Sequence, residues 1–357
     1  MTRFARVMPV YYVEEPAFEG ESPAHLVESR LAENLTVLVP HLPANTAYQI
    51  AVAQQRKLLT RFLTHRKIDA PVVWFYTAAA MEFARSLTAA TIVYDCMDEL
   101  SAFQGASPAM RQLETRLFQR ADVVFTGGQS LYEAKCERHH NVHAFPSAVD
   151  VAHFARARTD TEDPGDQCAI SHPRLGFFGV IDERFDRDLV ARVAQLRPDW
   201  QLIMLGPVVK IDPDILPKAP NIHYLGRKSY DELPAYIAGW DLAIMPFAIN
   251  EATRFISPTK TPEYLAAGKP IVSTPIVDVV RGWGNLEAVR IADTPANFVS
   301  EAEIALSLPK RDPDWLKPVD ARLAQVSWDR TWARMAELTT AALAHHQTEQ
   351  NAPNIAS

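Results

Sequence analysis

Short apolar runs alternate along the chain with longer amphipathic stretches. In the first half the runs are rich in β-branched and aromatic residues, which favours strands, and they lie at 7–13, 35–39, 71–76, 90–95, 122–126 and 141–145. Between several of them, apolar residues recur with helical spacing at 46–67, 107–120 and 129–138. Because the strands are apolar almost throughout and alternate with helices, the pattern predicts a parallel sheet covered on both faces.

The same alternation restarts after a polar stretch at 156–167, which contains proline and glycine, has no apolar face and is typical of an interdomain linker. Beyond it, strands are predicted at 174–180, 200–205, 221–225, 241–247, 270–274 and 288–291. Helices are predicted at 186–197, 229–239, 259–267, 294–307, 312–325 and 327–346. The fold class is therefore α/β, with two doubly wound, Rossmann-like domains that face each other across a cleft. We predict an N-terminal domain at 1–155, a linker at 156–170 and a C-terminal domain at 171–326.

Composition removes several function classes. Asp and Glu (43) outnumber Lys and Arg (36), which argues against a nucleic-acid-binding protein. The three cysteines contain no CxxC pair, which excludes a disulfide scaffold and a Cys-rich zinc site and fits a reducing compartment. The glycines form neither GxGxxG nor GxxxxGK[ST], so dinucleotide-binding Rossmann enzymes and P-loop NTPases are excluded. No apolar run approaches 18 residues and no signal peptide is recognisable, so we expect a cytoplasmic protein.

The segment NEATRFISPTKTPEYLAAGKPIVSTP carries the clearest chemistry. Ser257 is a good N-cap and Pro258 suits the first helical position, so a helix is predicted to begin there. Lys260 falls in the first turn of this helix and Arg254 lies just before it. Cations are unfavourable beside the positive end of a helix dipole unless an anion, such as a diphosphate, binds there. On residue types alone, a surface helix with a solvated lysine is an equal alternative.

The whole string resembles the donor-binding helix of GT-B glycosyltransferases, in particular family 4, group 1, of the bacterial polysaccharide type. The resemblance implies that Glu263 binds the ribose hydroxyls of a nucleotide sugar. It also implies that the backbone at Thr259 and the side chain of Lys260 contact the diphosphate. The family often has a further glutamate eight positions earlier, which touches the donor sugar. Phe255 stands there in this chain, so the donor sugar is left open.

The resemblance continues over residues 90–340. RLGFFGVIDERFD resembles the first strand and loop of the donor domain, where Gly179 lets the backbone approach the phosphates and Arg184 is the matching cation. For Arg184, pairing with the neighbouring acidic residues is an equal alternative. Two less specific matches to the family imply that Gly206 and Lys210 face the cleft and that Arg227 lies near the base of the nucleotide sugar. The implied donor-binding residues are Gly179, Gly206, Lys210, Arg227, Arg254, Ser257, Pro258, Thr259 and Glu263.

In the N-terminal domain, TIVYDCMDELSAF places acidic residues directly after a strand. Relatives often have a His-Asp pair here; Met97 occupies the histidine position and Asp98 the aspartate position. The resemblance therefore implies that Asp98 is an acceptor-side catalytic residue, together with Lys260 and Arg184. A carboxylate Mg²⁺ site and an acidic helix cap are the alternatives. The resemblance implies neither a metal nor a cofactor.

The resemblance also bears on the two ends of the chain. The C-terminal helix at 327–346 is expected to return and brace the N-terminal domain. GT-B N-terminal domains begin with a strand, a loop and a helix, whereas MTRFAR has the pattern of the last turns of such a helix. We therefore expect that the first strand of this domain is missing and that the natural chain has about 20 more residues upstream.

A basic amphipathic stretch at 53–67 combines Arg and Lys with Leu and Phe. A solvated helix face packed on its own sheet is one interpretation. Contact with the inner face of an anionic membrane, as in some relatives, is the other.

Taken together, the resemblance implies a hexosyltransferase-type glycosyltransferase (EC 2.4) of polysaccharide biosynthesis. It would move a sugar, with retention and without a metal, from a nucleotide-diphosphate donor, expected to be UDP-linked, to a glycan or lipid-linked acceptor. One alternative is a GT-B nucleotide-sugar epimerase, which needs no acceptor. The other is a catalytically inactive GT-B module that binds a sugar or a partner protein.

Overall fold

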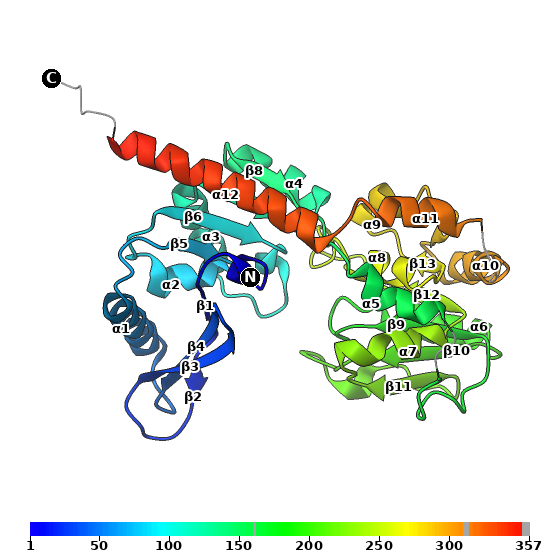
Figure 1. Ribbon diagram of the computed structural model, residues 1–357. Coiled ribbons are helices and arrows are strands. Elements are labelled where there is room, and N and C mark those ends of the chain that lie inside the picture. The colour runs from blue at the N-terminus through cyan, green and yellow to red at the C-terminus, as the bar shows by residue number, and fades with distance from the viewer. Residues whose placement is uncertain (160–161, 310–313, 352–357) are drawn as a thin grey trace.

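The computed structural model describes residues 1–159, 162–309 and 314–351, and the strands in these ranges form three sheets (Figure 1). The first eight strands are β1 (Val10–Val13), β2 (Ala17–Phe18), β3 (His25–Ala32), β4 (Leu35–Leu42), β5 (Val72–Phe75), β6 (Thr91–Cys96), β7 (Val123–Thr126) and β8 (Val142–Ala144). The remaining six are β9 (Arg174–Phe178), β10 (Gln201–Leu205), β11 (Ile222–Gly226), β12 (Leu242–Met245), β13 (Ile271–Ser273) and β14 (Val289–Ile291). All twelve strands predicted from the sequence are present.

The C-terminal sheet is continuous and parallel, in the order β11-β10-β9-β12-β13-β14. Every residue of β9 and β12 is buried, because helices cover both faces of the sheet and both strands are apolar except for Arg174, which pairs with Asp163. Its helices are α6 (Arg187–Leu196), α7 (Leu233–Ala238), α8 (Lys260–Ala266), α9 (Val277–Trp283), α10 (Pro295–Leu306) and α11 (Leu316–Leu323). One apolar core, with Trp200, Tyr264 and Phe177 fully buried, fills this region. The predicted α/β fold class, with a parallel sheet covered by helices on both faces, is therefore confirmed in this region.

The N-terminal strands differ from the prediction, because they form two four-stranded sheets instead of one. The order is β1-β4-β2 in the first sheet, with β3 antiparallel to β4, and β5-β6-β7-β8 in the second. Aromatic contacts join the two sheets: Phe4 packs against Trp74 with ring centroids 5.3 Å apart, and Tyr12 lies 6.2 Å from Tyr76. The β3 strand was not predicted, because most of its residues are exposed and it has no apolar run.

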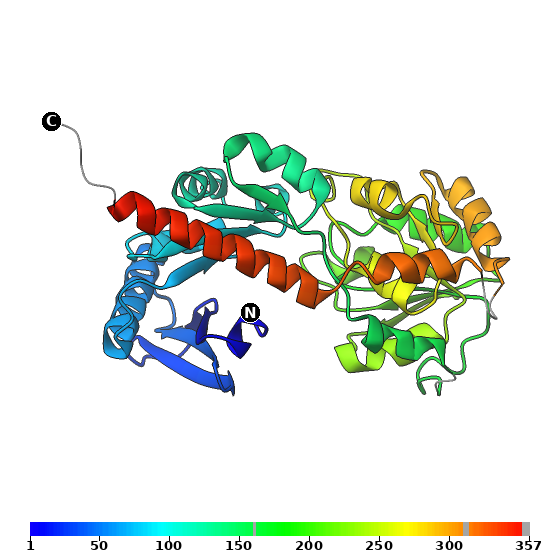
Figure 2. The same ribbon diagram turned by 45° about the horizontal axis from the view of Figure 1, so that its top comes forward.

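The helices of this region are α1 (Tyr48–Arg66), α2 (Met81–Ala84), α3 (Met110–Arg120), α4 (Gln129–Lys135) and α5 (Val151–Ala155). The C-terminal helix α12 (Trp328–Asn351) runs back along the second sheet, as both views show (Figures 1 and 2). Met335, Leu338 and Ala342 of α12 pack against Val93 of β6 and Phe125 of β7. The helix therefore braces the N-terminal strands, as the resemblance implied. None of the described helices has the length and apolarity needed to cross a membrane.

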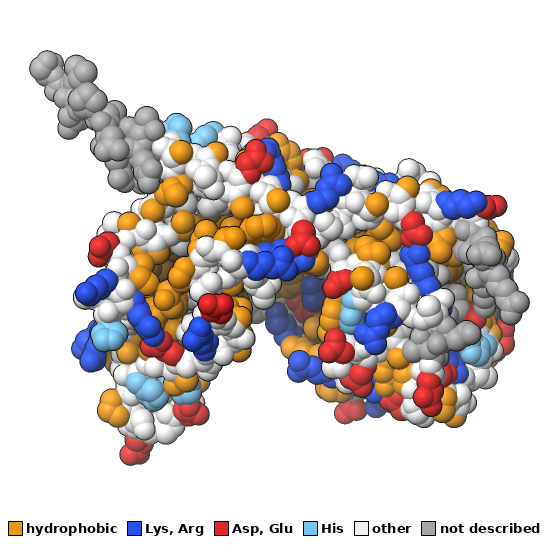
Figure 3. Space-filling view, in the orientation of Figure 1, with side chains coloured by type: hydrophobic (Ala, Val, Ile, Leu, Met, Phe, Trp, Pro, Cys, Tyr) orange, Lys and Arg blue, Asp and Glu red, His pale blue; other side chains and the backbone are white. Residues whose placement is uncertain are grey.

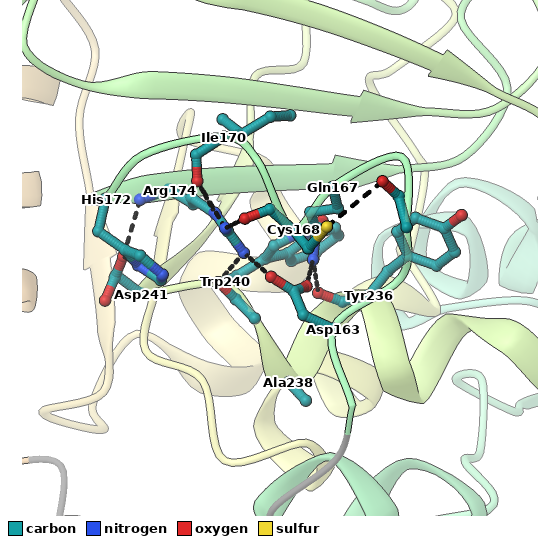
Figure 4. A network of polar contacts seen from close by, with 12 residues as sticks. Asp163, Gln167, Cys168, Ile170, His172, Arg174, Tyr236, Ala238, Trp240 and Asp241 are labelled. Carbon is teal, nitrogen blue, oxygen red and sulfur yellow. Dashed lines mark hydrogen bonds and ion pairs between the residues drawn. The ribbon is translucent and has the colours of Figure 1, made fainter.

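Part of the predicted linker is tied to the C-terminal sheet by a polar network (Figure 4). The Arg174 guanidinium at the start of β9 donates to Asp163 Oδ2 at 2.6 Å and to the Ile170 carbonyl at 2.5 Å. Buried Gln167 accepts a hydrogen bond from Trp240 Nε1 at 2.9 Å. These contacts lie at the amino end of β9, so they fix the sheet at the end that does not face the cleft. The linker and domain boundaries stay a prediction, and positions 160–161 and 310–313 lie outside the described residues.

Candidate functional site

Three glycines follow the neighbouring strands β9, β10 and β11 at their carboxyl ends. Gly179, Gly206 and Gly226 have φ of +146°, +140° and +70°, which side chains rarely adopt. A Cβ on Gly206 would lie 1.8 Å from the Gly179 carbonyl oxygen, and a Cβ on Gly179 would lie 2.3 Å from Lys260 Cε. The first two glycines therefore let the strand ends and the Lys260 stem pack closely at this edge of the sheet.

The helix that carries Lys260 begins later than predicted. The helix α8 starts at Lys260, with Thr259 as its flanking residue, so Ser257 is not the N-cap and Pro258 is not at the first helical position. The reason is tertiary packing: Ser257 faces the N-terminal region, where its Cβ would lie 2.6 Å from a Cβ on Gly128. The predicted stop is confirmed, since the helix ends at Ala266 and Gly268 follows with φ of +71°.

Lys260 and Glu263 form the half-buried charged centre of this site. The Lys260 ammonium lies over the rings of Phe177 at 5.8 Å and Phe247 at 5.9 Å, and burial lowers the pKa of Lys260. Burial raises the pKa of Glu263 to about 7, against the opposing effect of the Lys260 charge. Glu263 Oε2 is buried and has no hydrogen-bond partner among the described residues. Lys260 is thus not a solvated surface lysine, and Glu263 keeps a free acceptor for a ligand hydroxyl.

Asp98 and Arg184 are close enough to Lys260 for the charge of each to affect the pKa of Lys260. Burial raises the pKa of the Asp98 carboxyl, and the positive charges of Arg184 and Lys260 oppose that shift. The Arg184 guanidinium is held by Asp182, with contacts of 3.0 Å to Oδ1 and 2.7 Å to Oδ2. The structure therefore brings the three predicted catalytic residues together. It also shows Arg184 paired with an acidic neighbour.

Phe103 links the two regions at this point, a role that was not predicted. Its ring lies 5.2 Å from the Arg184 guanidinium carbon and 5.5 Å from Lys210 Nζ. Next to it, the Gln104 amide N–H donates to Glu183 Oε1 at 3.2 Å. A segment from the N-terminal region thus covers two cations that follow β9 and β10 (Figure 3 shows the hollow between the two halves).

Two predicted donor-binding arginines lie apart from this centre. Arg227 is exposed after β11. Arg254 is exposed, pairs with Glu251 at 3.7 Å and lies 5.1 Å over the ring of Phe255. Among the charges that act most strongly on Lys260 is Arg184, not Arg254. The expectation that Arg254 is the second cation beside Lys260 therefore needs correction.

Phe255 has a structural task that explains why it differs from the family pattern. Its side chain is partly buried and packs against an apolar core of the N-terminal region, the cluster that contains Leu131. Nearby, Asp278 Oδ1 of α9 accepts the backbone N–H of Ser130 in α4 at 3.0 Å, and the other oxygen of Asp278 has no partner among the described residues. The loop before α8 and the start of α9 therefore dock the two regions. The Asp278 contact was not predicted.

Comparison with known proteins adds to this geometry. Residues 172–306 match the family model described as Glycosyl transferases group 1. A putative teichuronic acid biosynthesis glycosyltransferase, TuaH of Bacillus subtilis (strain 168), is 27% identical over 233 residues, which are 60% of this chain and 58% of that protein. The resemblance to the group 1 glycosyltransferases is confirmed.

Solved structures show the fold. A trehalose 6-phosphate synthase from Burkholderia multivorans superposes with a TM-score of 0.68 at 15% identity, covering 94% of this chain and 92% of that one. A sucrose-phosphate synthase from Thermosynechococcus elongatus gives 0.64 at 14% identity, with coverage of 96% and 91%. HepE from Anabaena, solved with UDP and glucose, gives 0.61 at 14%, with coverage of 84% and 85%. The fold is GT-B.

Proposed function

We propose that this chain is a glycosyltransferase that moves a sugar from a nucleotide-diphosphate donor, UDP-linked, to a glycan or lipid-linked acceptor. The observation that carries the proposal is the Lys260–Glu263 pair, half-buried at the carboxyl end of the sheet beside Gly179. A cation and a free carboxylate oxygen, three residues apart, fit a diphosphate and the hydroxyls of a ribose. The HepE structure, which contains UDP and glucose, supports the choice of base.

In this mechanism the chain acts mainly through electrostatics. Lys260, with Arg184 near it, stabilises the negative charge that develops on the leaving diphosphate, in a site where the low dielectric strengthens the effect. Glu263 holds the ribose, so that the diphosphate lies against Lys260. Asp98, whose pKa is raised by burial, contacts the acceptor side of the reacting centre. The reaction proceeds with retention and without a metal or cofactor.

The proposal is tested by nucleotide binding and by acceptor dependence. Thermal unfolding is followed with UDP, GDP, ADP and CMP, since a ligand that binds only the folded protein raises its stability by about 2.7 kcal/mol at 100 times its Kd. We expect a shift with UDP alone. Release of UDP from a UDP-sugar should then depend on an added acceptor. Release of a free sugar isomer without an acceptor would instead indicate the epimerase, and no shift with any nucleotide would indicate the inactive module.

For the acceptor, we propose peripheral membrane contact through α1, at the inner face of the membrane, by a cytoplasmic protein. Tyr48 and Ile50 are exposed to 67% and 55%, and Lys57, Arg61 and Lys67 are also exposed on this helix. Exposed apolar residues beside basic ones suit an anionic lipid surface. Flotation with vesicles of phosphatidylglycerol should recover the protein, and Lys57→Glu/Arg61→Glu should abolish this. Equal recovery with neutral vesicles would contradict the contact.

A further inference from the structure

A cavity of about 470 Å³ opens beside the proposed donor site. Its walls are the loops that follow β9 and β10, and Gln104 of the N-terminal region closes one side. This volume lies within the range of small-molecule sites. The cavity shares Asp182 and Lys210 with the surroundings of Arg184 and Phe103, yet neither Lys260 nor Glu263 lines it. It is therefore adjacent to the nucleotide site and distinct from it.

The lining is strongly acidic, and most of its carboxylates already have partners. The lining contains five acidic residues and two basic ones, Arg187 and Lys210. The acidic residues are Asp182, Glu183, Asp186, Asp188 and Asp212. Asp182 holds Arg184, Asp186 caps α6 by accepting the Leu189 N–H at 2.9 Å, and Asp212 accepts the Asp214 N–H at 2.9 Å. These three carboxylates therefore shape the loops of the cavity.

Glu183 differs from these three residues. Its Oε1 accepts the Gln104 N–H, which spans the two regions, while its Oε2 is buried without a partner among the described residues. A buried acceptor of this kind is normally satisfied, so it calls for an explanation. Lys210 also lines the cavity and has φ of +65°, a conformation that residues with a side chain rarely adopt. Both features occur at the same cavity.

We propose that this cavity is a subsite for one sugar unit of the acceptor, and that the unit is a neutral hexose or an amino sugar. This inference rests on the proposed glycosyl transfer. The Glu183 carboxylate turns to accept a hydroxyl of the sugar, and Phe185, Ile211 and Ile215 give the cavity its apolar wall. Because the lining carries a net negative charge, a uronic acid or a phosphorylated sugar is repelled.

The test measures binding of simple sugars to the full chain by saturation-transfer difference NMR, with and without saturating UDP. The probes are methyl α-glucoside, glucosamine, glucuronate and glucose 6-phosphate. We expect the first two to bind at least about tenfold more tightly than the two anions, since juxtaposed like charges are costly. Glu183→Leu should abolish the signal, and Glu183→Gln should reduce the discrimination against glucuronate to about threefold or less. The control Glu287→Gln, exposed and outside the cavity, should change nothing.

The failure of this inference can be told apart from that of the proposed function. A wild-type protein that binds UDP but gives no sugar signal would overturn the subsite alone. Glucuronate binding as tight as that of the methyl glucoside, or an unchanged signal in Glu183→Leu, would also overturn it. A protein that shows no thermal shift with any nucleotide would overturn the proposed function. Near-ultraviolet circular dichroism and the UDP shift show whether each variant is folded.

Discussion

The two halves of this molecule differ in how their strands are arranged into sheets. In the C-terminal half, six parallel strands form one sheet around one core, and the glycine-lined strand ends meet at a single edge. In the N-terminal half, eight strands form two sheets, which aromatic contacts and α12 hold together. A continuous sheet fixes its strand ends relative to one another, because hydrogen-bonded ladders set their register. The proposed donor site and most of the proposed acceptor subsite are thus built on the continuous sheet, while Asp98 and Gln104 reach them from the composite half.

The N-terminal half depends on one buried charge network, so breaking that network should have the largest effect. Lys135 is buried and bonds Glu99 as well as Glu114, with Nζ–Oε distances of 2.8 and 3.0 Å to Glu114. Lys135→Met takes the cation from Glu99 and leaves Glu114 with Arg138 alone, and we expect a loss of about 3–5 kcal/mol in the free energy of unfolding. Lys57→Met, on an exposed face of α1, should cost almost nothing.

Calorimetry with and without UDP checks where that loss occurs. The variant should show a first transition at lower temperature that UDP does not move, followed by a UDP-sensitive one. A single transition that UDP raises as in the wild type would show that the contacts between the two halves make them unfold together, and would contradict this expectation.

The strand ends of the C-terminal half provide the next test. In Gly206→Ala the new Cβ meets the Gly179 carbonyl at 1.8 Å, and φ of +140° strains any side chain. We expect a loss of about 2–4 kcal/mol, together with weaker UDP binding, because the Gly179 loop must shift. Urea unfolding measures the first effect and calorimetric titration the second. Gly282→Ala, in α9, has open space around its Cβ, so it should leave UDP binding unchanged and raise stability by up to about 1 kcal/mol; similar losses in the two variants would refute the packing argument.

The smallest effect concerns the pH dependence of stability. The pKa of Glu263 is about 7 in the folded protein and near 4.5 when unfolded, so the folded state binds the extra proton between these values. Stability should therefore fall as pH rises from 4.5 to 7, by about 1–2 kcal/mol from this group. Urea unfolding of Glu263→Gln should show a flatter profile over this window. The same slope in the variant and the wild type would show that Glu263 is not the titrating group.

The donor half was the more predictable from sequence, for a physical reason. Lys260 and Glu263 lie three residues apart in one segment, and Gly179 and Gly206 each stand at the end of an apolar run. Such local patterns can be recognised in the sequence. The N-cap at Ser257 was predicted wrongly, because a contact with Gly128, far away in sequence, positions that residue. Phe103, Glu183 and Asp278 act across the two regions, and no local pattern marks such contacts. The β3 strand was not predicted for another reason. It is held by pairing with β4, whose residues are mostly buried, and has no apolar run of its own.

The central claim is that Lys260 is the main cation of a nucleotide-diphosphate site. Isothermal titration of UDP into the wild type, Lys260→Ala and Arg184→Ala tests it most directly. Because Arg184 donates hydrogen bonds to Asp182, while the Lys260 ammonium makes no hydrogen bond or ion pair with the described residues, Lys260→Ala should weaken binding at least about tenfold and clearly more than Arg184→Ala. Equal or reversed losses in the two variants, or no binding of UDP to the folded wild type, would contradict the account.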